Sequence, residues 1–373
     1  MIDFASALYL GMTHPAARLG DYAALTSGVP ASLAASPQAR GVAARAAELQ
    51  GCEAGAVAPS TLHLAVDTFD RLARSHVLIA DEALYPVMRW SLERVSGLGA
   101  SLSWFAHGDP AALVRVLRRS RAGKPPAVIT DATLRNGMPI APERYLEAVA
   151  SRDGLLVIDH SQVLGLLGEH PIPRQPWGLG GGGIAVHGGL GPSDPVLLLA
   201  SWAKAFGVPL ATLCGPAALV SDIACNGPTQ SHCSAANQAA LLAALDALDA
   251  NRRTGDWLRT RLLYFVRRLR AGLLSLARTV LPDLSATLPL HPMQRIHLST
   301  PGRTQALHAS LRACGFRTAL LHDAENRHAV VVIVRADHRL SDIDGLVQTM
   351  AATAPALPAS DETLSKSMGR HHV

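Results

Sequence analysis

An α/β fold, with a mostly parallel sheet covered by helices, is the class that this 373-residue sequence predicts. Short apolar runs of strand length alternate along the chain with stretches of helical periodicity, an alternation typical of parallel sheets. Two of the runs lead into residues of chemical interest, Asp159 and Lys204. Both residues therefore stand at the carboxyl ends of expected strands.

The expected strands of the large domain are apolar runs too short for a typical helix. They are residues Val77–Ala80, Leu102–Phe105, Ala127–Thr130, Leu155–Ile158 and Pro195–Ala200. The expected helices lie before, between and after them, at Pro37–Leu49, Leu62–Ala73, Pro110–Arg121, Pro142–Arg152 and Ser234–Leu281.

A smaller α/β domain is expected at the C-terminal end. Its strands are predicted at Arg295–Leu298 and Ala329–Val334, and its helices at Thr304–Ala313 and Ser341–Met350. The predicted organisation is an N-terminal arm (1–45), a large domain (46–281) and a small domain (282–373).

The amino-acid composition excludes some classes of function. With 49% hydrophobic and 17% charged residues, the chain is an ordinary globular protein with a sizeable core. A net charge of +5 with only 4% aromatic residues gives no platform for stacking bases, so we expect no nucleic-acid partner. The basic balance is either an ordinary solvated surface or an aid in recruiting an anionic thioester.

Cysteine usage and the N-terminus bear on location. The chain has five cysteines, Cys52, Cys214, Cys225, Cys233 and Cys314, and no C-x-x-C pair. This pattern argues against a disulfide framework and against a structural zinc site. We therefore expect no metal. The N-terminus does not resemble a signal peptide, and no apolar run reaches the ~18 residues of a membrane span. The sequence predicts a soluble, cytoplasmic protein.

Lys204 lies in the segment Ser201–Gly207, directly after an apolar strand and between small residues. A lysine there either extends its charged end to solvent or serves as a nucleophile. An ε-amino group attacks a carbonyl only when it is unprotonated, and partial burial lowers its pKa toward that state. The position therefore suits a Schiff base.

Asp159 strengthens that interpretation. A carboxylate at the end of one parallel strand and a lysine after another fit pyridoxal 5'-phosphate, the aspartate holding the pyridine nitrogen protonated and the lysine carrying the cofactor as an imine. Neither residue is convincing alone, but the pair predicts this cofactor.

The sequence resembles the α-oxoamine synthases. Residues 158–168 resemble their D-E-A-H-S-x-G-x-x-G segment, 201–207 their T-L-S-K-A-F-G, and 4–11 their F-x-S-N-x-Y-L-G opening. The resemblance runs in order from Phe4 to about Asp344. It implies the aspartate-aminotransferase-like architecture (fold type I), pyridoxal phosphate and a homodimer.

The resemblance also assigns further cofactor contacts. Ser60 and Thr61, at the start of a predicted helix, stand where the family binds the cofactor phosphate, and such a helix start favours anions. On the residues alone they are equally a helix cap. Thr229 matches a threonine that reaches the phosphate across the dimer interface, and Ser201 belongs to the lysine motif.

Four positions depart from the family pattern. Tyr85 replaces the histidine that stacks on the cofactor, unless it is only a structural tyrosine, and Gln162 replaces the histidine near the cofactor's phenolic oxygen. Ala7 replaces an asparagine, and Val331 stands where the family has the arginine that grips the substrate carboxylate. Arg327 and Arg335 are nearby in sequence, but strand alternation leaves their direction open.

The leading hypothesis is an α-oxoamine-synthase-like transferase. It would join the carbanion of an amino acid or amine to an acyl thioester such as acyl-CoA or an acyl-carrier-protein thioester, with Lys204, Asp159 and Tyr85 as catalytic residues. Two alternatives remain open: an aminotransferase or lyase on the same fold, and a non-catalytic scaffold subunit, against which Lys204 argues.

Overall fold

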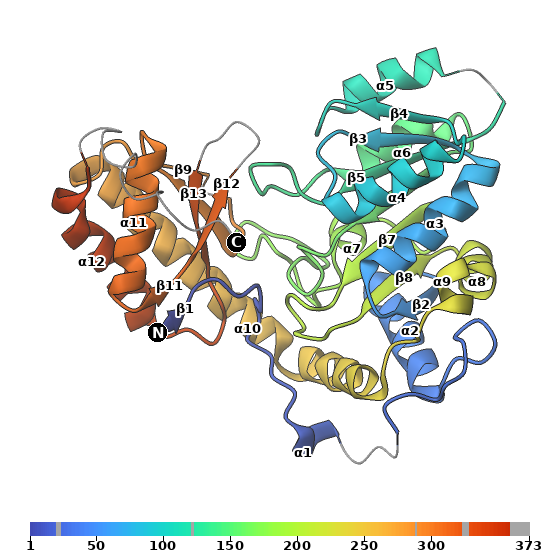
Figure 1. The fold of residues 1–373 in the computed structure, drawn as a ribbon, viewed down its shortest axis with the longest axis horizontal. Coiled ribbons are helices and arrows are strands. Elements are labelled where there is room, and N and C mark those ends of the chain that lie inside the picture. Colours follow the sequence, from blue (N-terminus) through green and yellow to red (C-terminus); the bar gives the residue numbers. More distant parts are fainter. Residues whose placement is uncertain (20–23, 121–122, 288, 323–327, 359–373) are drawn as a thin grey trace, which may run out of the picture. The chain divides into compact units, whose positions relative to one another are not determined.

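The computed structural model describes residues 1–19, 24–120, 123–287, 289–322 and 328–358 (Figure 1). The chain divides into two compact units. The larger contains residues 12–135 and 139–257, and the smaller contains 1–11, 136–138 and the chain from Leu258 onward.

A seven-stranded sheet forms the centre of the larger unit, with the strand order β2-β8-β7-β6-β5-β3-β4. β3, β4, β5, β6 and β7 run parallel, whereas β8 is antiparallel to both its neighbours. The bounds are β2 (Ala54–Ala58), β3 (Val77–Asp81), β4 (Leu102–Phe105), β5 (Pro126–Asp131), β6 (Leu155–Asp159), β7 (Val196–Ser201) and β8 (Ala211–Gly215). The predicted mostly parallel sheet is confirmed.

Helices follow the strands and cover the sheet (Figure 1). Their bounds are α1 (Ala16–Leu19), α2 (Pro37–Gln50), α3 (Thr61–Ser75), α4 (Pro86–Gly97), α5 (Pro110–Arg119), α6 (Pro142–Ala150), α7 (Ile184–His187), α8 (Ala217–Asn226) and α9 (Pro228–His232). Several begin with proline in the first turn, where a missing N–H costs no helical hydrogen bond.

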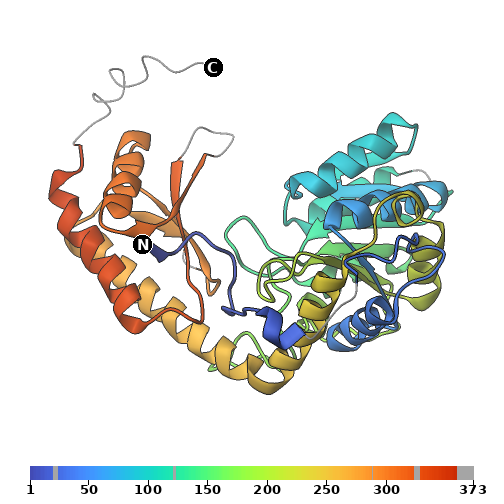
Figure 2. The same cartoon turned by 60° about the horizontal axis from the view of Figure 1, so that its bottom comes forward.

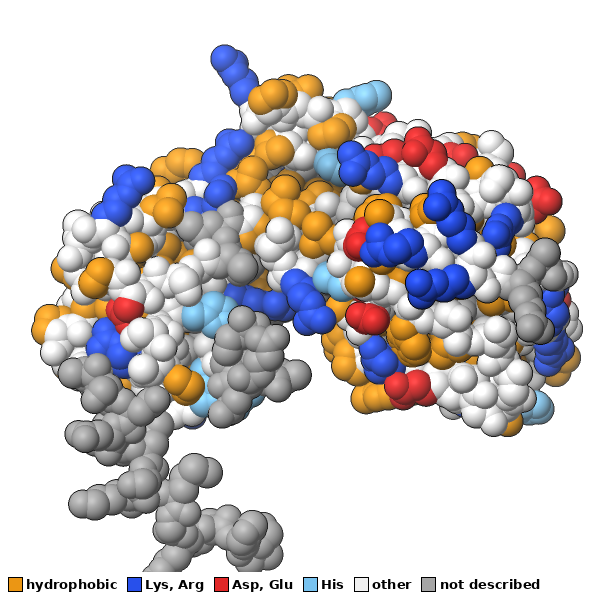
Figure 3. Space-filling model, turned by 90° about the horizontal axis from the view of Figure 1, so that it is seen from above, with side chains coloured by type: hydrophobic (Ala, Val, Ile, Leu, Met, Phe, Trp, Pro, Cys, Tyr) orange, Lys and Arg blue, Asp and Glu red, His pale blue; other side chains and the backbone are white. Residues whose placement is uncertain are grey.

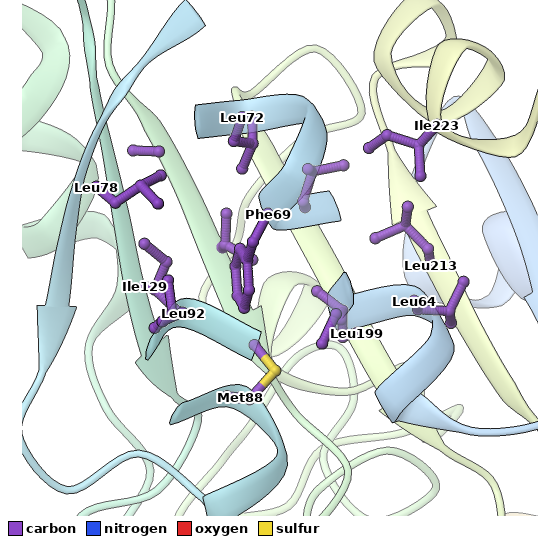
Figure 4. Close-up of a cluster of buried hydrophobic side chains, with 14 of the residues drawn as sticks. Leu64, Phe69, Leu72, Leu78, Met88, Leu92, Ile129, Leu199, Leu213 and Ile223 are labelled. Atoms are coloured by element: carbon purple, nitrogen blue, oxygen red, sulfur yellow. The ribbon is translucent and has the colours of Figure 1, made fainter. Parts of the chain in front are cut away.

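One buried cluster fixes α3 and α4 on the sheet. Phe69 and Leu72 of α3 and Met88 of α4 lie against Ile129 and Leu199 of the strands (Figure 4). All five side chains are fully buried. Each buried side chain of this size contributes about 1.5–3 kcal/mol, so the cluster holds the start of α3 near the carboxyl ends of the strands.

The smaller unit contains a four-stranded antiparallel sheet, in the order β12-β13-β10-β9, and a two-stranded parallel pair of β1 with β11. α11 packs on β13 and α12 packs on α11 (orange and red in Figure 2). The bounds are β1 (Ile2–Asp3), β9 (Ser285–Thr287), β10 (Met293–His297), β11 (Phe316–Arg317), β12 (Ala319–His322), β13 (His328–Ile333), α11 (Pro301–Ala313), α12 (Leu340–Thr353) and a 3-10 turn, Ala354–Ala356.

A single long helix, α10 (Gln238–Thr279), contributes to both units. The larger unit takes it as far as Trp257 and the smaller from Leu258, so the smaller unit begins earlier than the predicted boundary at residue 282. The reason lies in side-chain contacts: Arg261 donates to the carbonyls of Ala336 and His338, and Arg268 pairs with Asp344. The first residues of the predicted arm also belong to the smaller unit, through β1.

No helix in the described ranges is long and apolar enough to cross a membrane. On the face shown in Figure 3, Lys and Arg side chains lie among acidic and apolar ones.

Gly183 makes a close approach that a side chain would obstruct. Its φ is +94°, and an added Cβ would lie 2.4 Å from Nδ1 of His160, whose side chain is fully buried next to Asp159. We expect Gly183→Ala to lower the free energy of unfolding by about 2 kcal/mol or more, measured by urea denaturation.

Gly180→Ala is the matched control for that variant. Gly180 also has a positive φ, +80°, but an added Cβ would meet nothing within 4 Å. It should therefore cost only the backbone strain, about 1 kcal/mol. Equal losses in both variants would contradict the role given to the contact with His160.

Candidate active site

Four polar residues gather where parallel strands of the large sheet end. Asp81, Asp131, Asp159 and Ser201 are the last residues of β3, β5, β6 and β7, and Lys204 lies three residues after the end of β7. Since carboxyl ends of parallel strands share one edge of the sheet, these residues form one site. Asp159 and Lys204 lie near enough for their charges to interact; their roles toward a cofactor stay predictions.

Asp159 is held as a hydrogen-bond acceptor. Its Oδ1 accepts from the backbone N–H of Ser161 at 3.0 Å and from the hydroxyl of Ser161 at 2.6 Å. The same hydroxyl oxygen accepts the backbone N–H of Ser201 at 2.8 Å, which ties β6 to β7. Hydrogen bonds of this kind stabilise an ionised carboxylate. Ser161 was not among the residues predicted for the site.

Lys204 occupies a turn that the core fixes in place. Trp202, almost fully buried, donates its indole N–H to the hydroxyl of Thr212 at 2.9 Å, and Gly207 donates its backbone N–H to the carbonyl of Lys204. Burial lowers the pKa of the Lys204 amine, and the charges of Asp159 and Asp131 oppose that shift. A half-buried lysine with a lowered pKa is suited to attack a carbonyl.

Asp131 is a site residue that the sequence analysis missed. It pairs in register with Asp159 across β5 and β6, and its Oδ2 accepts the backbone N–H of Tyr85 at 3.1 Å. Burial, together with the charge of Asp159, raises the pKa of the Asp131 carboxyl to about 8. The signal available in the sequence was its place directly after an apolar run, the same signal that identified Asp159.

Asp81, another aspartate at this edge of the sheet, has a lowered pKa, in contrast to Asp131. Burial alone would raise the pKa of Asp81, but hydrogen bonds from His107 and from the backbone N–H groups of Ala83 and Gly108 lower it. His107 donates Nδ1–H to Asp81 at 2.8 Å, because its Nε2 accepts the backbone N–H of Arg135 at 3.0 Å. The pair positions the loop that follows β5.

Tyr85 and Gln162 lie next to these carboxylates along the chain. Tyr85 precedes α4 as its N-cap, and the residue is 55% exposed. Gln162 follows Ser161 and is half-buried. The backbone of both residues is at the strand ends, and the contacts of their side chains with a cofactor stay predictions.

The start of α3 has no side-chain cap. Ser60 is the N-cap, but its side chain makes no capping bond; its hydroxyl is hydrogen-bonded to Nδ1 of His63 at 2.8 Å. Thr61 begins the helix, whose first N–H groups therefore have no side-chain cap. Unpaired N–H groups and the helix dipole both favour a phosphate there.

Thr229 is tied to that helix within its own chain. Its hydroxyl donates to Oδ2 of Asp67 at 2.6 Å, and its backbone N–H donates to Oδ1 at 2.8 Å. The contact predicted for Thr229 across a dimer interface stays a prediction.

In the smaller unit, Val331 lies in the interior of β13 and is 2% exposed. Arg335 pairs with Asp3 and Asp337, and Arg327 lies outside the described residues. At the position where the α-oxoamine synthases have the carboxylate-binding arginine, this chain has the uncharged side chain of Val331. The guanidinium of Arg335 already pairs with two carboxylates.

A cavity of about 520 Å³ in the larger unit lies elsewhere, between the segment from Ala24 to Arg40 and β2. None of the eight predicted site residues lines it. Among the described residues no group of three or more His, Cys, Asp or Glu side chains is placed to hold a metal, and all five cysteines are free thiols.

The chain is similar in sequence to known proteins, although no family model matches it. In sequence it is 29% identical over 218 residues to an 8-amino-7-oxononanoate synthase of Dechloromonas aromatica, a match that covers 58% of this chain and 53% of that protein. The chain thus spans about half the length of that curated relative.

Two solved structures share the fold. A serine palmitoyltransferase of Sphingomonas wittichii superposes with a TM-score of 0.82 at 15% identity, over 96% of this chain and 88% of that one. An 8-amino-7-oxononanoate synthase of Francisella tularensis gives 0.74 at 15% identity, over 95% and 98%. These likenesses establish the fold, which is the predicted fold type I, and the curated relatives confirm the resemblance to the α-oxoamine synthases.

Proposed function

We propose that this protein is a pyridoxal-phosphate-dependent transferase of the α-oxoamine synthase type. It would join the carbanion of an amino acid or amine to an acyl thioester. The observation that carries the proposal is the pairing, at the ends of β6 and β7, of Lys204 with a lowered pKa and Asp159 fixed by Ser161.

The residues present fit this cofactor. Lys204 supplies the amine for its covalent attachment, Asp159 the carboxylate for the pyridine nitrogen, and the uncapped start of α3 at Ser60 and Thr61 the N–H groups for its phosphate. Tyr85, Gln162, Ser201 and Thr229 complete the proposed contacts. When bound, the cofactor acts as an electron sink that stabilises a carbanion next to the amine nitrogen.

Residues of the chain supply the remaining roles, which are proton transfer and positioning. Asp159, fixed by its two hydrogen bonds from Ser161, would be the carboxylate that faces the ring nitrogen of the cofactor. Lys204, whose pKa is lowered by burial, would be the base whose Nζ takes up and returns a proton. The Asp81–His107 pair holds the loop after β5 in place.

The substrates and setting belong to the same proposal. The donor is a small amino acid or amine, and the acceptor is an acyl-CoA or an acyl-carrier-protein thioester. The α-oxoamine synthase resemblance supports a homodimer, with Thr229 near the neighbouring site, and free thiols support a reducing, cytoplasmic location.

An aminotransferase or lyase is the second candidate function. The buried Val331, where the family has an arginine, favours it, because a valine cannot form the bidentate pair that fixes an amino-acid carboxylate. A non-catalytic scaffold is less well supported, since Lys204 and Asp159 are both in place.

Product analysis distinguishes the candidates. The cofactor-loaded protein is incubated with single amino acids, each with and without an acyl-CoA, and the products are identified by mass spectrometry. The proposal predicts an amino ketone and free CoA only when both substrates are present. Conversion of the cofactor to its pyridoxamine form by an amino acid alone, indifferent to thioester, would establish an aminotransferase.

A further inference from the structure

Two aspartates stand side by side at the end of the sheet. Asp131 and Asp159 are the last residues of the adjacent parallel strands β5 and β6 and pair in register. Residues in register on neighbouring strands direct their side chains to the same face. Two carboxylates so placed do not both ionise readily, and the pair holds a proton between them.

Hydrogen bonding decides which carboxyl keeps that proton. Asp159 accepts two hydrogen bonds at Oδ1, from the N–H and hydroxyl of Ser161, and both stabilise its charge. Asp131 accepts one backbone N–H, from Tyr85, at Oδ2. Its Oδ1 is buried and has no hydrogen-bond partner among the described residues. A buried oxygen in that position is more stable as part of a neutral carboxylic acid.

The charges around Asp131 also favour its neutral form. Asp81, ionised through His107, adds a second negative charge near Asp131. Lys204 is the cation that opposes both aspartates, and burial weakens it by favouring the neutral amine. These groups account for the raised pKa of Asp131, about 8.

We propose that Asp131 is a neutral carboxylic acid at neutral pH and holds a proton beside Asp159 at the strand ends. The role of Lys204 as the carbonyl-attacking amine rests on the proposed function, whereas the charge state of Asp131 does not.

Infrared spectroscopy of the full chain freed of cofactor tests the charge state directly. At neutral pH the carbonyl stretch of a protonated carboxylic acid should be present in the wild type and lost in Asp131→Asn. It should remain in Asp81→Asn, because Asp81 is ionised by its hydrogen bonds. The folded pKa of Asp131 is raised, so the proton is held below it, and the band should fade as pH rises through about 8. A band absent from the wild type, or retained in Asp131→Asn, would overturn the proposal.

Reactivity of the Lys204 amine gives a second, independent readout. The cofactor-free chain is labelled by reductive methylation at a series of pH values, and the extent at Lys204 is found by peptide mapping. Asp131→Asn replaces a neutral group with a neutral one and should leave the methylation of Lys204 unchanged at pH values below 8.

Different results separate the two claims. A marked increase in the methylation of Lys204 below pH 8 in Asp131→Asn would show that Asp131 is charged there and refute its neutral state. If the band and the profile behave as expected but product analysis finds no pyridoxal chemistry, the proposed function fails and the neutral Asp131 stands.

Discussion

Replacing Lys204 with alanine is expected to abolish covalent attachment of pyridoxal phosphate and to lower turnover at least about 10³-fold. Burial lowers the pKa of the Lys204 amine, which makes the amine a nucleophile and a proton carrier that alanine cannot replace. Visible absorption of the loaded protein and steady-state assays measure the two effects. Methylamine should restore part of the proton transfer to the variant.

Lys124→Ala is the control for that experiment. Lys124 is exposed, and its loss should leave both the absorption and the turnover unchanged. Retention of a covalently bound cofactor in Lys204→Ala would remove the basis of the proposed mechanism.

Asp159→Asn is expected to lower turnover by about 10²-fold or more while the protein still folds. Asparagine preserves the shape and accepts the Ser161 hydrogen bonds, but it carries no charge to keep a ring nitrogen protonated. Steady-state kinetics and the affinity for the cofactor measure the loss.

Ser161→Ala provides a graded comparison for the aspartate variant. It removes one of the two donors to Asp159 and the acceptor for the Ser201 N–H. We expect a smaller loss, of about tenfold, equivalent to about 1.4 kcal/mol. Equal turnover in Asp159→Asn and the wild type would show that Asp159 does not contact the reacting group.

The sequence predicted the elements whose pattern is local. Long apolar runs such as Leu155–Ile158 predict buried strands on their own, and the helices between them show clear periodicity. β2 and β8 were not predicted, because Ala54–Ala58 is built of small residues without strand preference and pairs with a strand far along the chain. The smaller unit combines part of α10 with the pairing of β1 and β11, which are contacts between segments far apart in the chain.

Some residues of the candidate site could be selected from the sequence and others could not, for a related reason. Lys204 and Asp159 were selected from the sequence because each lies after an apolar run, and the start of α3 because helix N-termini favour anions. Asp131 was overlooked, although it also ends a strand, because its importance arises only from its register with Asp159. Ser161 likewise gains its role from the geometry that links Asp159 to Ser201.

The attachment point of the cofactor tests the central claim most directly. The chain has only three lysines, Lys124, Lys204 and Lys366, so reduction of the loaded protein with borohydride followed by peptide mapping gives an unambiguous answer. Our account predicts a pyridoxyl group on Lys204 and on neither other lysine. A pyridoxyl group on Lys124 or Lys366, or on none of the three, would contradict it.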